Sequence, residues 1–382
     1  MPASIRKALN ELPATLDDTY ERALQGIPKE KRQYAHRLFH CLVGAIRPLS
    51  AEELAEIFAI DFDTDAISNL MEDWRPEHAE EAVLSTCSTL ISIIEDKGTR
   101  IVQFSHFSVK EYLTSDRLRS SEVGNICHYY VPLDSSHTIL ARACLATLLQ
   151  LDENVDKDHL EAFPLALYAA RNWVKHAKYE DVSSRVQDAM ELFFNPRKSY
   201  LAAWVRLYHV VDPYVEPPSP PGKAALYFAA LCGFSGVVNS LITHSEVDIA
   251  EYCHSGAPLH VASREGHIGV VHVLLQHNVD VNAKCTSFKT WTPLHFASDR
   301  GYAKVAQLLL EHGANINAQS TLKTTPLIAA SFHGHLEVVR LLLSNGADVT
   351  IRAERGSAFR RATKQRHFEV AQLLLEHGAE KE

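Results

Sequence analysis

Histidine is the residue type with the clearest potential for chemistry in the second half of this sequence. Ten histidines lie between residues 260 and 377, and the pairs His333-x-His335 and His267…His272 could in principle share a metal ion. The HExxH pattern does not occur, and no acidic residue stands at ligand spacing from these pairs. We therefore expect no metal site and assign these histidines structural roles.

A second cluster with chemical potential contains Ser105, His106 and Ser108, followed by Glu111. A hydrolase would need an oxyanion site and a base directed at the serine, and this spacing offers neither. We expect Ser105 to cap a helix instead. The sequence also contains neither a GxSxG nucleophile motif nor a GxxxxGK[ST] phosphate-binding loop. The chain is therefore predicted to be non-enzymatic and to need no cofactor.

Composition and charge favour a protein partner over a nucleic acid. The 382 residues are 46% hydrophobic and 22% charged, and 38 basic against 47 acidic side chains give a net charge of −9. No apolar run approaches the roughly 20 residues of a membrane helix, and the first residues do not resemble a signal peptide. The seven cysteines are scattered without a CxxC pair, which is typical of buried thiols in a reducing compartment. We expect a cytoplasmic protein, with the nucleus as the alternative.

Internal repetition is the strongest signal in the sequence. Five segments align: AALYFAALCGFSGVV, APLHVASREGHIGVV, TPLHFASDRGYAKVA, TPLIAASFHGHLEVV and SAFRRATKQRHFEVA. Their second residues are spaced 33, 35, 33 and 32 apart, at Ala225, Pro258, Pro293, Pro326 and Ala358. This period and the T-P-L-H-x-A pattern resemble the ankyrin repeat. The resemblance covers roughly residues 223–382, with repeats at about 223–255, 256–290, 291–323, 324–355 and 356–382.

The residues of these repeats fit stacked helix pairs on physical grounds. Thr292 can cap a short helix, Pro293 suits its first position, and Gly301 can end it. Arg366 stands at the Gly301 position in the last repeat, where a left-handed backbone would strain it. Left-handed stops after the second helices are expected at Asn278, Gly313, Gly346 and Gly378. Small residues at the helix contacts are expected at Ala229, Ala262, Ala297, Ala329 and Ala362.

The ankyrin resemblance implies that the recurring histidines form hydrogen bonds between neighbouring repeats. It also implies that function lies on the hairpin loops and first helices, which form an extended surface. Aromatic, apolar and cationic side chains on these loops are candidate anchors for a protein partner of acidic character. The candidate protein-binding residues are Tyr252, Phe288, Lys289, Trp291, Leu322, Lys323, Arg352 and Arg355. The alternative is that Trp291 packs on its own hairpin and the basic residues are only solvated.

The first half of the sequence has the pattern of helices interrupted by a hairpin. Two helix starts are predicted from the capping patterns Thr15–Asp18 and Ser50–Glu53. Further helices are expected over 28–45, 79–90, 105–115, 137–151, 163–177, 183–194 and 199–210. ISIIE and RIVQF are expected as two strands joined by a turn. Apolar faces are expected to include Leu16, Tyr20, Leu24, Leu38, Leu42, Ile46, Phe107 and Tyr112. The recurring aromatics of the later helices, Trp173, Phe193, Trp204 and Tyr208, are expected in the core.

Helices followed by a two-stranded wing are the parts of a winged helix. LPATLDDTYERAL, RPLSAEELAEIFAID, LSTCSTLISI and VQFSHFSVKEYLTSDRL resemble the winged-helix segment that follows the NACHT nucleotide-binding domain in fungal immune-receptor-like proteins, also named after GPI inositol-deacylase. We therefore predict a mainly α protein. Its parts are a winged-helix module with a small β-hairpin at 1–125, a helical spacer at 126–210, a proline-rich linker at 211–222, and an ankyrin solenoid.

The resemblance implies a regulatory role toward a nucleotide-binding domain, which this sequence lacks by motif. The first hypothesis is a non-enzymatic scaffold that binds a protein through its ankyrin loops. The alternative is the sensor and regulatory part of a truncated or split NACHT switch, in which a partner supplies the NACHT domain. A DNA-binding winged helix is a third alternative, but the expected face around Glu77, Glu80 and Glu81 would repel phosphate.

Overall fold

Two compact units make up the chain. The computed structural model describes residues 15–381 apart from 64–68, 122, 124, 156, 212–223, 246, 248, 250–255 and 286–289. Contacts group residues 1–193 and 202–215 into the first unit, and residues 194–201 and 216–382 into the second. Among the described residues no helix is long and apolar enough to cross a bilayer. The proposed linker at 211–222 lies, except for Val211, outside the described residues.

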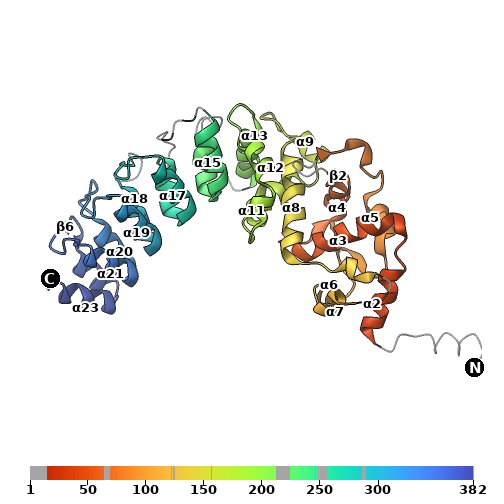
Figure 1. The fold of residues 1–382 in the computed structure, drawn as a ribbon, viewed down its shortest axis with the longest axis horizontal. Helices are drawn as coiled ribbons and strands as arrows, with labels where there is room; N and C mark the ends of the chain where they lie inside the picture. The colour runs from red at the N-terminus through yellow and green to blue at the C-terminus, as the bar shows by residue number, and fades with distance from the viewer. Residues whose placement is uncertain are drawn as a thin grey trace, which may run out of the picture. The chain divides into compact units, whose positions relative to one another are not determined.

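The first unit begins with helices around a three-stranded antiparallel sheet (Figure 1). Its elements are α2 (Leu16–Gln25), η1 (Lys29–Lys31), α3 (Arg32–Gly44), β1 (Leu49–Ser50), α4 (Ala51–Phe58), β2 (Ile60–Asp61), β3 (Asn69–Leu70), η2 (Glu72–Trp74), α5 (Ala79–Cys87), β4 (Ile91–Asp96), β5 (Thr99–Phe104), α6 (Phe107–Leu113), α7 (Asp116–Arg119) and η3 (Ile126–Tyr129). The sheet order is β1-β5-β4, and Ile93 pairs with Val102 in the β4–β5 hairpin. The order α3-β1-α4-α5-β4-β5 is that of a winged helix, as predicted.

Local capping explains where two of these helices begin. Ser50 Oγ accepts the backbone N–H of Glu53, and the Glu53 carboxylate accepts the N–H of Ser50 at 2.8 Å. Thr15 and Asp18 form the same reciprocal pair before α2. Each box satisfies backbone donors that the first helical turn leaves unpaired. Both predicted helix starts are confirmed.

Several expected details of this unit are wrong. Leu16, Ile46 and Phe107 are exposed, because α3 already ends at Gly44 and because only one face of α2 and α6 meets the core. The predicted helix at 79–90 stops at Cys87. The predicted helix at 183–194 is two helices, which are separated at Val186.

The remaining helices of this unit follow the winged helix along the chain. They are α8 (Leu133–Leu148), α9 (Lys157–Ala162), α10 (Ala166–Ala177), α11 (Val182–Arg185), α12 (Gln187–Phe193) and α13 (Tyr200–Val211). Helix α8 contacts both α3 and α10. Trp173, Phe193 and Trp204 meet edge to face, with centroids 5.1 to 6.0 Å apart, and form the expected aromatic core. The Trp204 indole N–H donates to the Ala170 carbonyl at 2.9 Å.

The second unit contains five stacked helix pairs (Figure 1). The pairs are α14 (Ala225–Cys232) with α15 (Ser235–His244), α16 (Pro258–Glu265) with α17 (Ile268–Gln276), α18 (Pro293–Arg300) with α19 (Ala303–Glu311), α20 (Pro326–His333) with α21 (Leu336–Ser344), and α22 (Ala358–Lys364) with α23 (Phe368–Glu376). First helices contact first helices of the next pair, and second helices contact second helices. The predicted repeat architecture is therefore confirmed.

A histidine or tyrosine ring of the next repeat packs on the turn between the two helices of a repeat. Gly301 ends α18 with a φ of 79°, and a Cβ atom there would lie 2.6 Å from Nδ1 of His335. The Nε2–H of His335 donates to the Asp299 carbonyl at 2.8 Å. The same packing joins Gly233 to His267, Gly266 to Tyr302, and Gly334 to His367. The glycine is therefore required by its backbone conformation and by the neighbouring ring.

Left-handed backbone occurs at the predicted positions. Gly313, Gly346 and Gly378 have φ values of 84°, 85° and 89°, and Asn278 has a φ of 57°. One of the small residues expected at the helix contacts is wrong. The carbonyl of Ala330, and not that of Ala329, accepts the backbone N–H that closes the turn after α20. Arg366 also has a positive φ, 64°, so the strain expected from the sequence is present.

Replacing Arg366 with glycine should stabilise the last repeat. The substitution removes a left-handed conformation that costs a side-chain-bearing residue about 1–2 kcal/mol, partly offset by the entropy of glycine, so a net gain of about 1 kcal/mol is expected. Chemical denaturation of the full chain measures it. Lys364→Gly, at the last residue of α22, is the matched control and should destabilise. An unchanged or lower stability of Arg366→Gly would contradict this account.

Candidate functional site

Hairpin closures are described in three of the connections between repeats, and five of the loop residues that the sequence singled out lie on them. The N–H of Cys285 donates to the Trp291 carbonyl at 2.8 Å, which closes one hairpin. The N–H of Ser320 donates to the Thr324 carbonyl at 3.0 Å and closes the next. The third hairpin consists of the short strands β6 (Arg352–Ala353) and β7 (Gly356–Ser357).

Two buried histidines connect the first two of these hairpins to the preceding repeat. The N–H of Thr292 donates to Nδ1 of His295 at 3.2 Å, and Nε2 of the same ring donates to the Thr324 carbonyl at 2.9 Å. His260 makes the equivalent bonds to the Ala257 N–H and the Ala283 carbonyl, at 3.1 and 2.8 Å. Burial lowers the pKa of His295 to about 4, and burial also lowers the pKa of His260. These neutral rings are structural connectors, as the ankyrin resemblance implied.

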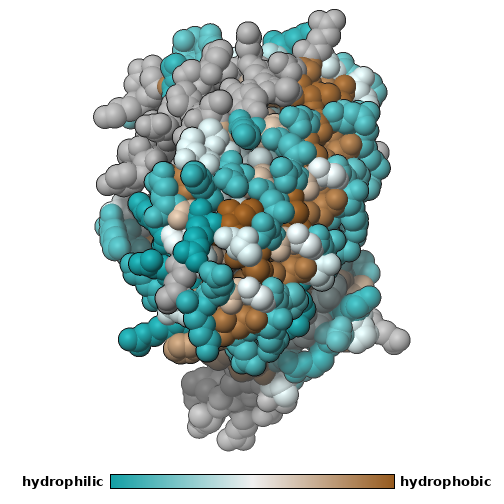
Figure 2. All heavy atoms as spheres, turned by 90° about the vertical axis from the view of Figure 1, so that its left-hand side faces the viewer, coloured by the Kyte–Doolittle hydropathy of each residue, from teal (hydrophilic) through white to brown (hydrophobic). Residues whose placement is uncertain are grey.

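A hollow of about 230 Å³ lies beside the last two of these hairpins. It is lined by Trp291, Asp299, Leu322, Thr324, Ile328, Ala329, Phe332, His333, Ala353, Arg355 and Arg361. These residues come from the hairpins and from the first helices α18, α20 and α22. Seen from the C-terminal end of the repeats, brown apolar areas of the surface lie between teal polar ones (Figure 2). An apolar hollow with a polar rim has the composition of a site for a protein segment.

Two arginines lie at this hollow without a carboxylate to neutralise them among the described residues. The guanidinium carbon of Arg361 lies 3.9 Å from the centroid of the Phe332 ring. Burial and then the charge of Arg355 lower the pKa of Arg361. The acid of the hollow, Asp299, lies 3.1 Å from Nε2 of His333. In the described part of the chain neither Arg355 nor Arg361 forms an ion pair, so their positive charges face the hollow together.

The structure brings three of the eight predicted site residues together and separates the others. Trp291, Leu322 and Arg355 all line the hollow. Lys323 lies on its hairpin with a φ of 55°, and it does not line the hollow. Arg352 forms a surface ion pair with Glu380 at 2.9 Å. Tyr252, Phe288 and Lys289 lie outside the described residues.

Trp291 is anchored within its own repeat. Its side chain is 7% exposed and its ring lies 5.2 Å from the Phe296 ring at a steep angle, in a buried cluster with Cys285. One edge of the tryptophan therefore lines the hollow while most of the ring belongs to the core. This matches the alternative weighed from the sequence, in which Trp291 packs on its own hairpin.

Phe332 and Asp299 line the hollow and were not found from the sequence. They occupy the same position in their repeats, where the other repeats carry Leu231, Arg264 and Lys364. A position that varies from acidic to basic to aromatic cannot be needed for stacking. That variation is the signal that could have marked it as part of a surface.

The serine–histidine cluster of the first unit caps a helix. His106 and not Ser105 is the residue before α6, and its Nδ1 accepts the N–H of Ser108 at 3.3 Å. The same nitrogen lies 2.5 Å from Ser108 Oγ, so the expectation that no base is directed at a serine is wrong in geometry. Ser108 Oγ also shares a hydrogen bond with the Tyr20 hydroxyl at 2.6 Å. The arrangement fixes α6 against α2, and we assign it this positioning role.

The expected DNA-reading face of the winged helix is acidic. Glu52, Glu77, Glu80 and Glu81 line a wide, open depression along α5. Arg100 forms an ion pair with Glu80 and so neutralises only part of this charge. Such a face repels a phosphate backbone.

Comparisons with known proteins agree with both halves of this architecture. The model of the ankyrin repeats (3 copies) matches residues 200–285, 226–320, 282–353 and 319–382. The model of the GPI inositol-deacylase winged helix domain matches residues 20–139. The chain therefore carries ankyrin repeats, which are non-catalytic protein-interaction modules, and a winged helix of the GPI-inositol-deacylase type.

A curated relative covers most of this architecture. The azaphilone pigments biosynthesis cluster protein L of Monascus ruber is 30% identical over 296 residues, which are 72% of this chain and 61% of that protein. The chain thus spans about three fifths of the length of the relative that it matches.

The buried ring of His295 should make the repeats sensitive to acid. Its folded pKa of about 4 lies below the ordinary value of 6.5, so the unfolded chain takes up a proton first as the pH falls. The contribution of this ring to stability should be complete above pH 6.5 and should decrease down to about pH 4, by at most about 3 kcal/mol. Chemical unfolding at several pH values measures it.

The variant His295→Gln should be less stable at pH 7 but should lose less further stability on acidification. His312→Gln is the control, because the ring of His312 is exposed and its Nδ1 contacts the Leu308 carbonyl of its own helix. Equal pH slopes for the wild type and His295→Gln would count against the assignment.

Proposed function

We propose that this chain is a non-enzymatic interaction scaffold and that its ankyrin repeats bind an acidic protein segment in the hollow beside Arg355 and Arg361. The observation that carries the proposal is the pair of arginines that face one apolar hollow without a carboxylate partner in the described part of the chain. Two like charges held close together favour a ligand that brings negative charge. The apolar lining favours an anchor side chain such as leucine or phenylalanine beside the acids.

The geometry supports a division of roles within the site. Phe332, Leu322 and Ile328 supply apolar contact area, and Trp291 stiffens the hairpin that borders it. Arg361 is positioned by its stacking on Phe332, so its guanidinium loses little conformational freedom when it binds. Arg355 stands on the exposed hairpin between β6 and β7, where it can meet an approaching acidic segment first. An extended peptide with an apolar residue flanked by aspartate or glutamate fits these features.

A peptide display experiment with a random library tests the proposal. The immobilised full chain should select peptides enriched in acidic residues around one large apolar residue. The double variant Arg355→Glu/Arg361→Glu should lose these peptides, with affinities weaker by about tenfold or more, and binding to the wild type should weaken with salt. Arg340→Glu is the matched control, because Arg340 is exposed on α21 and does not line the hollow. Selection of the same peptides by the double variant would refute the proposal.

A second candidate function is the regulatory part of a NACHT-type switch, with the nucleotide-binding domain supplied by the parent protein or by another chain. The specific observation that favours it is the winged-helix match over residues 20–139. In this case the first unit contacts the nucleotide-binding domain and transmits the occupancy of the repeats. A P-loop reading frame next to this gene, and co-purification of its product with this chain, are expected. If no P-loop frame lies next to this gene and no P-loop protein co-purifies with the chain, this candidate is removed.

A further inference from the structure

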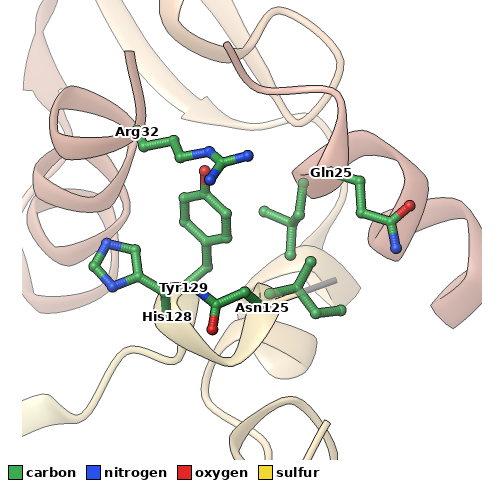
Figure 3. A pocket seen from close by; sticks show the side chains of 7 residues that line it. Gln25, Arg32, Asn125, His128 and Tyr129 are labelled. Atoms are coloured by element: carbon green, nitrogen blue, oxygen red, sulfur yellow. The ribbon is translucent and has the colours of Figure 1, made fainter. Parts of the chain in front are cut away.

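A small pocket with a mixed polar and apolar lining lies in the first unit, far along the sequence from the ankyrin repeats. Its volume is about 30 Å³, and it lies between the end of α2, the start of α3 and η3 (Figure 3). The lining residues are Leu24, Gln25, Arg32, Asn125, Ile126, His128 and Tyr129. This space is enough for one or two water-sized groups. A ligand here would be a small ion or the head of one side chain.

Two hydrogen-bond donors in this pocket have no partner among the residues that the structure describes. The Tyr129 side chain is 3% exposed, and its hydroxyl is one of these buried donors. Nε of Arg32 is the other. The hydroxyl of Tyr129 points at the guanidinium of Arg32 (Figure 3). Because buried polar groups are nearly always paired, two orphan donors directed at one space indicate a missing acceptor.

The position of Tyr129 is set by its surroundings and not by the missing acceptor. Its ring meets Phe39 at 6.0 Å and His128 at 5.7 Å, both edge to face. Asn125, at the start of η3, has a left-handed backbone with a φ of 63°, which brings the chain back over α2 and α3. The donors are therefore held in place before any ligand arrives, and such preorganisation favours binding.

The charge of the pocket selects the kind of acceptor. Arg32 forms no ion pair among the described residues, and none of the residues that line the pocket is acidic. A water molecule could accept from both donors but would bring no charge to pair with the guanidinium of Arg32, which is half-buried. A monovalent anion would satisfy both requirements, with charge-assisted hydrogen bonds.

We propose that Arg32 and Tyr129 form a binding site for a small monovalent anion, either a halide or the carboxylate of an acidic group. The anion accepts one hydrogen bond from Nε–H of Arg32 and one from the Tyr129 hydroxyl. Because these residues begin α3 and end η3, the bound anion connects two segments that are 97 positions apart in the sequence. Occupancy therefore stabilises the contact of η3 with α2 and α3.

Thermal unfolding and hydrogen exchange of the full chain test this site. Chloride and formate serve as small probes at matched ionic strength, and gluconate serves as an anion too large for the pocket. Chloride or formate should raise the melting temperature of the first unit by about 2–4 °C over gluconate. Amide exchange at residues 126–129 should slow in parallel. A response to chloride assigns a free-ion site, and a response to formate assigns a carboxylate site.

Variants separate the site from general salt effects. Arg32→Gln and Tyr129→Phe should both lose the response to small anions. In gluconate, Tyr129→Phe should be as stable as the wild type or more stable, because it removes a buried unpartnered hydroxyl. Lys29→Gln is the control and should respond like the wild type, since Lys29 is exposed and lies outside the pocket. Equal melting temperatures of the wild type in all three salts would overturn the proposal, as would an equal response of Tyr129→Phe and the wild type.

Discussion

The packing of one repeat's ring on the left-handed turn of the preceding repeat is the contact on which the second unit depends. The turn can form without strain only at a glycine, and in three of these four turns a carbonyl just before the glycine accepts a hydrogen bond from an imidazole of the next repeat. A single repeat carries only one half of each contact. Stability therefore arises between repeats, as expected for a linear array. The hairpins keep their positions because the buried rings of His260 and His295 extend the same principle to the loops.

Much of the fold could be predicted from the sequence because its signals are local. The proline-led first helices, the glycine and asparagine stops, and the capping boxes each depend on residues within a few positions of one another. Failures occurred where longer contacts decide. Ile46 continues the apolar stripe of α3 in sequence, yet the helix ends at Gly44 and Ala45 is already extended. Phe107 looks like a core residue by type, yet the face that it occupies on α6 meets solvent.

The candidate site was only partly predictable, for a related reason. The loop residues were visible as aromatic and basic types in unusual loops, and three of them do line one hollow. The direction of a loop side chain depends on the geometry of its hairpin. A backbone hydrogen bond joins Cys285 to Trp291, and the tryptophan ring packs against Phe296. Part of the lining comes from first helices, where Phe332 and Asp299 hold a position outside the T-P-L-H-x-A pattern. The pocket of Arg32 and Tyr129 could not be seen in the sequence, since its two donors are brought together only by tertiary structure.

The contacts between repeats and the surface that the repeats expose are formed by different residues. Glycines and the histidine or tyrosine rings packed on them hold neighbouring repeats together, whereas Phe332 and Asp299, at equivalent positions, differ in side chain without altering these contacts. Recognition can therefore be altered one position at a time while the scaffold stays intact. A duplicated or transplanted repeat would carry its own half of each contact, so this protein can acquire new specificities by exchanging whole modules.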